Sequence, residues 1–565
     1  MKQFRWQLLI ILLTGLTVGL ILFLQKESTT SPNPTSTPSP ISGGIYTEAL
    51  VGKFLRLNPM LEYHNQPDQD INRLLFNSLV MFDAAGLPQP DLALGWNSSE
   101  ADTRFTFSLK TDVVWHDGSP FGAQDVAYTV QLLKSGNAVI PEDLRQFWSE
   151  VNFNVLSDEL IEFTLPEAFS PFLDYLSFRI LPAHLLGNLD LNQLIDHPYN
   201  LAPIGTGPYR FKQLDFKDGV ITGVQLEANE FYFGGRPYIQ EVNFVYYPDE
   251  QTAFAAFQAG EVDGLAGISP DILPEVLVDE NMNLYSTREP KLSMVLLNLN
   301  NDAKAFLKDQ KVRQALMISL NRQAMVDRVM NGQAILAQGP VLTGSWAYYA
   351  GLEPISFDPE VSRQILATAE ITPSEAGTGL VTKDGVEVSL VLLVQNDPRH
   401  LAIAEIIKSN WDAIGVQTTL LSKSHAEIMN DLTAHAYVAA LVDIDLSGTP
   451  DPDPYPFWGQ AMIQAGQNYS QWDNRTASSY LEQARLTLDT ELRTKLYRNF
   501  QVLFQEELPS LPLFYPIFNY GVRNTILDVR IGPIYQAADR FNNINTWYIL
   551  TGTNDPTQVG AETSN

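Results

Sequence analysis

The segment 386–444 limits the possible folds most, because strand-like and helix-like patterns alternate along it. Residues 386–394 form an apolar run rich in β-branched side chains, too short for a typical helix. Residues 400–414 place apolar side chains at helical spacing and end at Gly415. The pattern continues with a strand at 416–421, a helix at 424–432 and a strand at 437–444. Strands that alternate with helices pair in parallel through right-handed crossovers, so the sequence predicts at least one α/β domain.

Other parts of the chain carry the same mixture of signals. Phe105, Phe107 and Leu109 alternate with polar residues, which is the period of a half-buried strand, and a helix is expected at 123–134. One helical run is predicted at 312–330, ended by a C-cap at Asn331-Gly332. No period of 20–50 residues repeats, which argues against solenoids and propellers.

Length and composition exclude several classes of protein. The 565 residues correspond to roughly three or four domain-sized units. The formal net charge of −29 would repel phosphate groups, so neither nucleic acid nor an anionic lipid surface is expected as a main partner. The absence of cysteine excludes disulfides, thiol nucleophiles, cysteine zinc sites and cysteine-attached lipid anchors.

The N-terminus predicts export. Lys2 and Arg5 precede a nearly unbroken apolar run at 8–24, which as a helix would span about 25 Å. Its length and flanking charges favour an uncleaved signal anchor over 1–27, a transmembrane helix with its N-terminus in the cytoplasm. The alternative is a secretory peptide that is cleaved, and both readings export the body. Residues 28–42 are rich in Ser, Thr and Pro and predict an extended tether, and 553–565 a flexible tail.

A search for enzyme chemistry finds no catalytic pattern. The GxSxG nucleophile elbow and the HExxH zinc motif are both absent, and the seven histidines include no pair at ligand spacing. The glycine-rich segment 205–209 lacks the Lys-Ser/Thr of a phosphate loop, so we interpret it as a rigid turn into a strand at 209–214. The chain is therefore not expected to be an enzyme, and no cofactor is expected.

One acidic loop is a candidate site. Its carboxylates follow the predicted strand 437–444 and lie close to three aromatic residues: Asp443, Asp445, Asp451 and Asp453, then Tyr455, Phe457 and Trp458. Loops at the carboxyl ends of parallel strands are where α/β sheets bind ligands. The loop would suit a cationic group beside an apolar side chain. It lacks the order of a calcium-binding EF-hand loop, and a merely solvated turn is the equal alternative.

Several motifs together resemble a known family. The chain is similar to the extracellular solute-binding proteins, family 5, of ABC importers, which take up oligopeptides, dipeptides and nickel. The resemblance covers about 42–550 and rests on collinear segments: 79–96, 105–130 with WHDG at 115–118, IGTGPYRF at 204–211, 232–238, 249–263 and VRQALMISLNR at 312–322. The chain departs from the family in lacking a lipobox cysteine and in having Asn321 where relatives often have Asp.

The resemblance implies an α/β, periplasmic-binding-protein-like fold of two lobes, in the large class with an extra inserted subdomain. Lobe I would comprise 43–80, 203–290 and 523–552, and lobe II would comprise 291–522. The inserted subdomain would be 81–202. Two strands that cross near 290 and 522 would form a hinge, and its closure would bury the ligand.

The resemblance also implies a function and a site. The chain would be a monomer on the extracytoplasmic face of the bacterial cell membrane, anchored by its N-terminal helix or cleaved and secreted. It would capture oligopeptides and deliver them to ABC permease subunits with cytoplasmic ATPases. In the family an Asp pairs with the peptide α-amino group, and Asp445 and Asp451 are both candidates here. Possible wall residues are Tyr455, Phe457, Trp458, Trp472 and Trp346. Chelated nickel, a sugar, or a sensor role remain alternatives, and an exported hydrolase is disfavoured.

Overall fold

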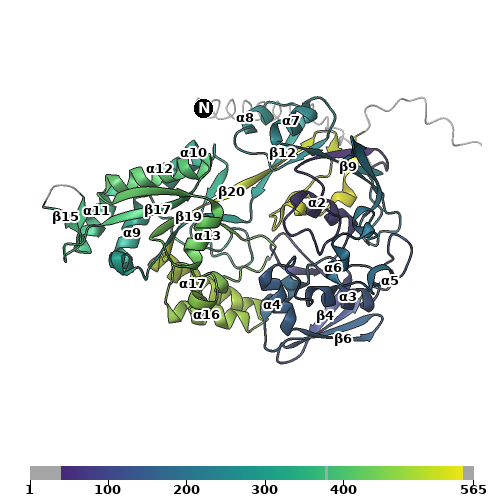
Figure 1. The fold of residues 1–565 in the computed structure, drawn as a ribbon, viewed down its shortest axis with the longest axis horizontal. Helices are drawn as coiled ribbons and strands as arrows, with labels where there is room; N and C mark the ends of the chain where they lie inside the picture. The colour runs from purple at the N-terminus through teal and green to yellow at the C-terminus, as the bar shows by residue number, and fades with distance from the viewer. Residues whose placement is uncertain (1–39, 376–378, 449, 551–565) are drawn as a thin grey trace, which may run out of the picture. The chain divides into compact units, whose positions relative to one another are not determined.

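The computed structural model describes residues 40–375, 379–448 and 450–550 (Figure 1). The predicted anchor at 1–27, nearly all of the predicted tether at 28–42 and the predicted tail at 553–565 lie outside these residues. Among the described residues, no helix combines the length and apolar character that a membrane crossing needs. Residues Ser42–Tyr548 form one compact unit.

A mixed twelve-stranded sheet runs through this unit. Its neighbours follow the order β18-β17-β19-β13-β20-β11-β1-β10-β9-β8, and β12 and β14 also pair with β20. The strands are β1 (Ile45–Val51), β8 (Tyr209–Lys217), β9 (Val220–Ala228), β10 (Glu241–Tyr247), β11 (Gly264–Ala266), β12 (Met282–Arg288), β13 (Lys291–Leu297), β14 (Ala334–Leu336), β17 (Ser389–Gln395), β18 (Gln417–Lys423), β19 (Ala439–Asp445) and β20 (Ser510–Arg523).

Strand β20 joins the two halves of this sheet. Its first part pairs with β13 and β14 up to Pro516, and its second part pairs with β12 and β11 from Ile517 onward. The chain passes between the halves a second time at Glu289-Pro290, between β12 and β13. The two crossings touch, because the Glu289 amide donates to the Pro516 carbonyl at 2.8 Å.

The predicted strand–helix alternation at 386–444 is confirmed. Strand β17 pairs in parallel with β18 and β19, and the connections are helices α12 (Pro398–Ala413) and α13 (His425–Thr433). Both helices lie beside these strands in Figure 1. Ser424 caps α13 and Gly415 adopts φ +90° after α12, so the local signals set the helix ends.

The single helix expected at 312–330 is wrong. The structure contains α9 (Gln310–Ile318) and α10 (Arg322–Arg328) in its place. Asn321 interrupts the run because its side-chain oxygen accepts the Ala324 amide hydrogen and caps α10. The predicted end at 330 lies two residues beyond Arg328, where α10 ends, and Asn331 and Gly332, both with positive φ, follow in the turn after it.

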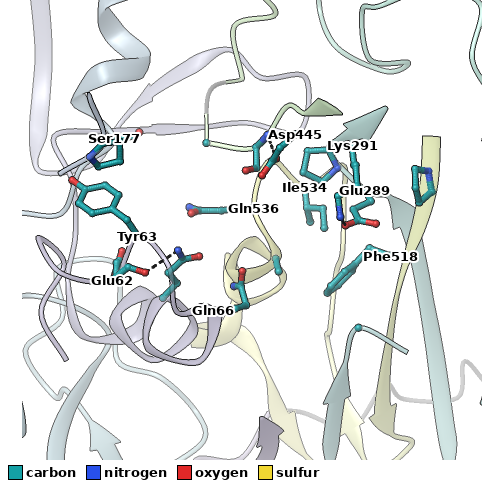
Figure 2. Close-up of a pocket in the computed structure, with 18 of the residues that line it drawn as sticks. Glu62, Tyr63, Gln66, Ser177, Glu289, Lys291, Asp445, Phe518, Ile534 and Gln536 are labelled. Atoms are coloured by element: carbon teal, nitrogen blue, oxygen red, sulfur yellow. Dashed lines mark hydrogen bonds and ion pairs between the residues drawn. The ribbon is translucent and has the colours of Figure 1, made fainter. Parts of the chain in front are cut away.

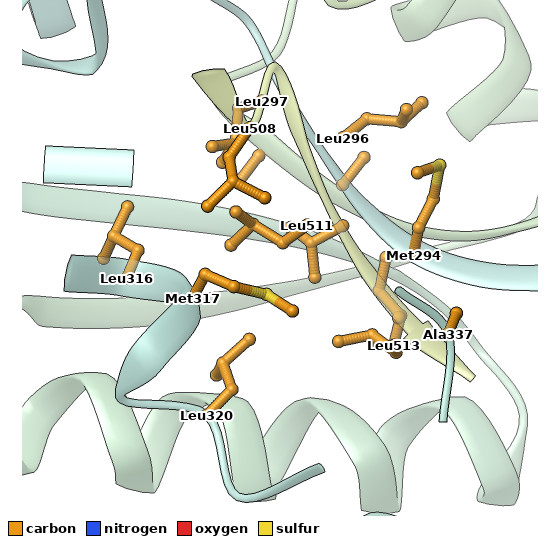
Figure 3. Close-up of a cluster of buried hydrophobic side chains, with 14 of the residues drawn as sticks. Met294, Leu296, Leu297, Leu316, Met317, Leu320, Ala337, Leu508, Leu511 and Leu513 are labelled. Carbon is orange, nitrogen blue, oxygen red and sulfur yellow. The ribbon is translucent and has the colours of Figure 1, made fainter. Parts of the chain in front are cut away.

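A buried apolar cluster packs β13 and β20 against α9 (Figure 3). Met294, Leu316, Leu511 and Leu513 are each at most 1% exposed within it. Burial of each such side chain contributes about 1.5–3 kcal/mol. Other α-helices of the described residues are α2 (Gln66–Leu75), α5 (Ala183–Leu186), α6 (Leu191–Leu194), α7 (Glu250–Gln258), α8 (Leu273–Val276), α11 (Pro359–Thr368), α14 (Tyr455–Trp458), α15 (Met462–Ala465), α16 (Arg475–Arg485) and α17 (Thr490–Glu507).

A separate four-stranded antiparallel sheet lies within 81–202. Its order is β4 (Ala93–Ser98), β5 (Arg104–Leu109), β7 (Leu160–Thr164) and β6 (Asn152–Ser157). Phe105, Phe107 and Leu109 are buried, as their alternation predicts. Helices α3 (Ala123–Leu133) and α4 (Glu142–Glu150) and the 3-10 helix η1 (Ser170–Leu176) accompany this sheet.

The glycine-rich turn at 205–209 is structural, as predicted. A Cβ atom at Gly205 would overlap the carbonyl oxygen of Leu75 at the end of α2, so only glycine fits this approach. The Gly205 amide donates to Nδ1 of His116 at 3.1 Å. The turn and the WHDG segment therefore fix each other, and the chain continues into β8.

A fully buried polar network ties β1, α2 and β20 to the 3-10 helix η4 (Ala537–Phe541). Arg540, which is 0% exposed, donates to Glu48 at 3.1 Å and to both oxygens of Asp70 at 2.8 and 2.9 Å. Tyr520 donates to Glu48 at 2.9 Å. Burial raises the pKa of Glu48, against the opposing charge of Arg540.

Candidate functional site

A cavity of about 790 Å³ lies beside the two crossings of the sheet. Its wall is built from the start of α2 and the residues before it, the segment after η1, the β12–β13 turn, the end of β19 and the middle of β20. Figure 2 shows Glu62, Tyr63 and Ser177 on one side and Glu289, Lys291 and Asp445 on the other. Segments from distant parts of the sequence therefore meet here, at the carboxyl end of a parallel strand, where α/β sheets bind ligands.

Asp445 supplies a carboxylate to this cavity. It is the last residue of β19, is exposed, and its Oδ1 accepts the Ser447 amide hydrogen at 2.9 Å. The two cations on the same wall form ion pairs with other carboxylates. Lys291 pairs with Glu289 at 2.7 Å, and Arg399 pairs with Asp443 at 2.6 Å. Among the residues that the structure describes, Asp445 has no ion-pair partner. It can therefore accept a cationic group from a ligand.

Asp451 occupies a different environment. It is 5% exposed, does not line the cavity, and forms an ion pair with the buried Arg493. Its carboxylate also accepts a hydrogen bond from Tyr497 at 3.3 Å, and its amide donates to Asp174 at 2.8 Å. Burial and the neighbouring charge of Asp451 raise the pKa of Asp174. The structure therefore places Asp445 in the cavity wall and Asp451 in a buried ion pair, although the sequence makes both residues candidates for the same role.

The aromatic residues expected as walls lie elsewhere in this structure. Trp458 and Trp472 are each 3% exposed and pack in the core against Phe504. Trp346 packs on Tyr497. The ring centroid of Tyr455 lies 4.6 Å from the guanidinium carbon of Arg485. Phe457 packs against the same core as Trp458 and Trp472. None of these five residues lines the described cavity.

Other aromatic residues line the cavity instead: Tyr63, Trp148, Tyr175, Phe178 and Phe518. Sequence reasoning missed them because they come from separate segments that only the tertiary fold brings together. The expected crossing of two strands was the one signal that pointed toward Phe518, which lies on β20 just after the change of partners.

A second polar cluster surrounds Asp443, which lies on β19 two residues before Asp445. His400, at the start of α12, lies between Asp397 (2.6 Å from Nδ1) and Asp443 (3.4 Å from Nε2). Arg399 and the Ser293 hydroxyl also bond Asp443. The Ser293 hydroxyl therefore faces a carboxylate and not the imidazole, so these residues do not form a serine–histidine pair. Among the residues described, no three His, Asp or Glu side chains could together hold a metal ion.

The stability contributed by His400 is expected to depend on pH. Burial alone would lower the pKa of His400, but the hydrogen bond and charge of Asp443 raise it above its ordinary value. A raised folded-state pKa stabilises the fold fully below the unfolded-state pKa of about 6.5, and this contribution is lost as pH rises through the folded-state pKa. We expect His400→Asn to cost about 1.5–3 kcal/mol below pH 6 and clearly less at pH 9. Urea unfolding of both proteins at each pH measures the difference, and a cost that does not change with pH would contradict the assignment.

Comparison with known proteins finds related sequences along most of the chain. A family model described as bacterial extracellular solute-binding proteins, family 5, middle, matches residues 88–465. The oligopeptide-binding protein AppA of Bacillus subtilis (strain 168) is 26% identical over 533 residues, which cover 93% of this chain and 95% of that protein. The nickel-binding periplasmic protein of Escherichia coli (strain K12) is 27% identical over 481 residues, covering 81% and 86% respectively.

Solved structures agree with this result. The structure of HbpA2 from Haemophilus parasuis superposes with a TM-score of 0.77 and 25% identity, covering 88% of this chain and 99% of that one. The similarity therefore extends over most of the chain.

Proposed function

Because the chain belongs to family 5 of the bacterial extracellular solute-binding proteins, we propose that it is the extracytoplasmic substrate-binding component of an ABC importer that captures oligopeptides. Its α/β fold is that of the periplasmic-binding-protein class. The observation that carries the peptide proposal is the cavity beside the sheet crossings, in which Asp445 has no ion-pair partner among the described residues. Its partners would be the membrane permease and the associated ATPases.

The mechanism follows from the position of the cavity. We assign lobe I to 43–80, 203–290 and 523–552, the inserted subdomain to 81–202, and lobe II to 291–522. The change of partners along β20 and the Glu289-Pro290 crossing support a hinge between the lobes. Closure around this hinge would remove water from the cavity and strengthen the pairing of Asp445 with a ligand ammonium group. Anchoring by residues 1–27 would keep the protein at the outer face of the membrane.

Asp445→Asn is expected to weaken peptide binding at least tenfold, because a charge-assisted hydrogen bond to the peptide ammonium group is lost. Isothermal titration calorimetry of the purified full chain with Ala-Ala-Ala measures the affinity. Asp112→Asn is the matched control, since Asp112 is exposed and does not line the cavity. Equal affinities for the two variants would exclude Asp445 as the ammonium site.

The natural ligand can be identified directly by mass spectrometry of small molecules released when the purified protein is denatured. A mixture of peptides supports the proposal. A nickel chelate would instead favour the second candidate, which the similarity to the nickel-binding protein of Escherichia coli suggests. Either ligand is compatible with a chain that has no cysteine, because a chelated metal does not need protein thiolates.

A further inference from the structure

We infer that Asp143 binds a basic side chain of the ligand, so that the cavity prefers peptides that contain lysine or arginine. This inference rests on the proposed function and deepens it, because it states which peptides the cavity selects. Asp143 lies in the first turn of α4, lines the cavity and is exposed.

The ionisable residues of the cavity wall leave an excess of negative charge. The carboxylic acids of the lining outnumber its cations by five to three: Glu62, Asp143, Asp174, Glu289 and Asp445 against Arg179, Lys291 and Arg399. Each of these cations already pairs with a carboxylate, since Arg179 lies 2.9 Å from Glu62 and the other two form the ion pairs described above. A peptide ammonium group at Asp445 would therefore still leave negative charge in the wall.

The carboxylate of Asp143 is available to a second cation. Among the described residues its side chain forms no hydrogen bond and no ion pair. The nearby cation Arg145 does not line the cavity and donates to the Gly136 carbonyl at 3.3 Å. Asp174 differs, because it is 6% exposed and accepts the Asp451 amide hydrogen. Asp143 is thus the carboxylate on this part of the wall that a ligand can reach unpaired.

Aromatic side chains accompany Asp143. Tyr63 and Tyr175 line the same cavity and are half-buried. Burial is the main cause that raises the pKa of both hydroxyl groups, and the charge of Asp143 raises each of them further. The carboxylate therefore acts on both tyrosines. Trp148 and Phe178 extend this aromatic wall, with their ring centroids 5.4 Å apart.

A carboxylate beside an aromatic wall suits a long basic side chain. The methylene groups of lysine or arginine pack on apolar surface while the charged end remains with the carboxylate. A cation close to aromatic rings gains a further attraction from their π faces. Figure 2 shows Tyr63 across the cavity from Asp445, so one ligand can present its ammonium group to Asp445 and a basic side chain to Asp143. The net charge of −29 also attracts basic peptides over a longer range.

The neighbouring residue Glu142 provides a matched control. A carboxylate in the first turn also stabilises a helix through the helix dipole, and both Glu142 and Asp143 lie in the first turn of α4. Glu142 is exposed as well, but it does not line the cavity. Glu142→Gln therefore removes the same charge from the same turn and leaves the cavity wall unchanged.

The test compares Ala-Lys-Ala and Ala-Ala-Lys with the same peptides carrying norleucine in place of lysine, in calorimetric titrations of the full chain. Norleucine keeps the apolar part of the side chain and has no charge. The wild-type protein is expected to bind the lysine peptide at least fivefold more tightly at one of the two positions. Asp143→Asn is expected to reduce this preference to less than twofold, whereas Glu142→Gln should retain it.

Three results would overturn the inference. One is a wild-type protein that does not prefer lysine at either position, and another is a preference that persists in Asp143→Asn. The third is an equal loss in Asp143→Asn and Glu142→Gln, which would assign the preference to the overall charge of the protein. Asp143→Ser replaces the asparagine variant if that variant does not fold.

Failure of all four peptides to bind would defeat the proposed function rather than this inference. Thermal unfolding with N-acetyl-lysinamide and N-acetyl-norleucinamide, which have no free termini, would then test Asp143 by itself. Stabilisation by the lysine compound alone, in the wild-type protein and in Glu142→Gln but not in Asp143→Asn, would support the inference. The absence of this difference would overturn it.

Discussion

Replacement of Arg540 by alanine is expected to lower the free energy of unfolding by about 3–5 kcal/mol. Arg540 is fully buried and is the cation that neutralises Glu48 and Asp70. Its removal leaves two carboxylates in the interior without a counter-charge. Because the free energy of unfolding of a domain is only about 5–15 kcal/mol, this loss is a large fraction of the stability of the protein. Urea unfolding followed by tryptophan fluorescence measures the loss.

Two comparisons make this result specific. Arg530→Ala removes an arginine whose side chain is 74% exposed and should change stability by less than about 0.5 kcal/mol. In Arg540→Ala the pKa of Glu48, which burial already raises, would rise further in the folded state, so its penalty is present at neutral pH and falls as pH drops toward 4. A loss of stability that is the same at pH 7 and pH 4.5 would contradict the role assigned to Arg540.

Asp451→Ala is expected to destabilise the protein by about 3–5 kcal/mol and to leave the affinity of the folded protein for peptide nearly unchanged. The reason is that Arg493 would remain buried without its carboxylate, and that Asp451 does not line the cavity. Asp445→Asn is the matched variant and should behave in the opposite way, with weaker binding and a stability change within about 0.5 kcal/mol.

Measurement of both properties in both variants tests the assignment. Chemical unfolding gives the stability, and titration at a temperature where both variants are folded gives the affinity. Selective loss of binding in Asp451→Ala, with stability retained, would show that Asp451 and not Asp445 faces the ligand.

The sequence predicted the parts of the fold that depend on local patterns. The period of 386–444 is enough to predict a parallel unit because each helix begins at a cap such as Ser424 and ends at a residue such as Gly415. The break at Asn321 was missed because apolar spacing continues through it, and only the capping contact to Ala324 reveals the interruption.

The candidate site depended on pairings that lie far apart in the sequence. Asp445 and Asp451 look alike in the chain, and the difference arises because Arg493 reaches Asp451 from α17. Likewise, Glu62 and Arg179 are 117 residues apart, so no local pattern could show that one is the partner of the other. Composition and motifs predicted the class of protein, but the tertiary contacts decide which carboxylate is available.

The late position of β20 in the chain has a consequence for the order of folding. Within the described residues, β12 and β14 pair with β20 alone, and β11 and β13 each have it as one of two neighbours. Both halves of the sheet therefore keep open edges until residues 510–523 have been synthesised. A ribosome-bound fragment that ends before residue 510 cannot close either half, so completion of the sheet is delayed until almost the whole polypeptide has emerged.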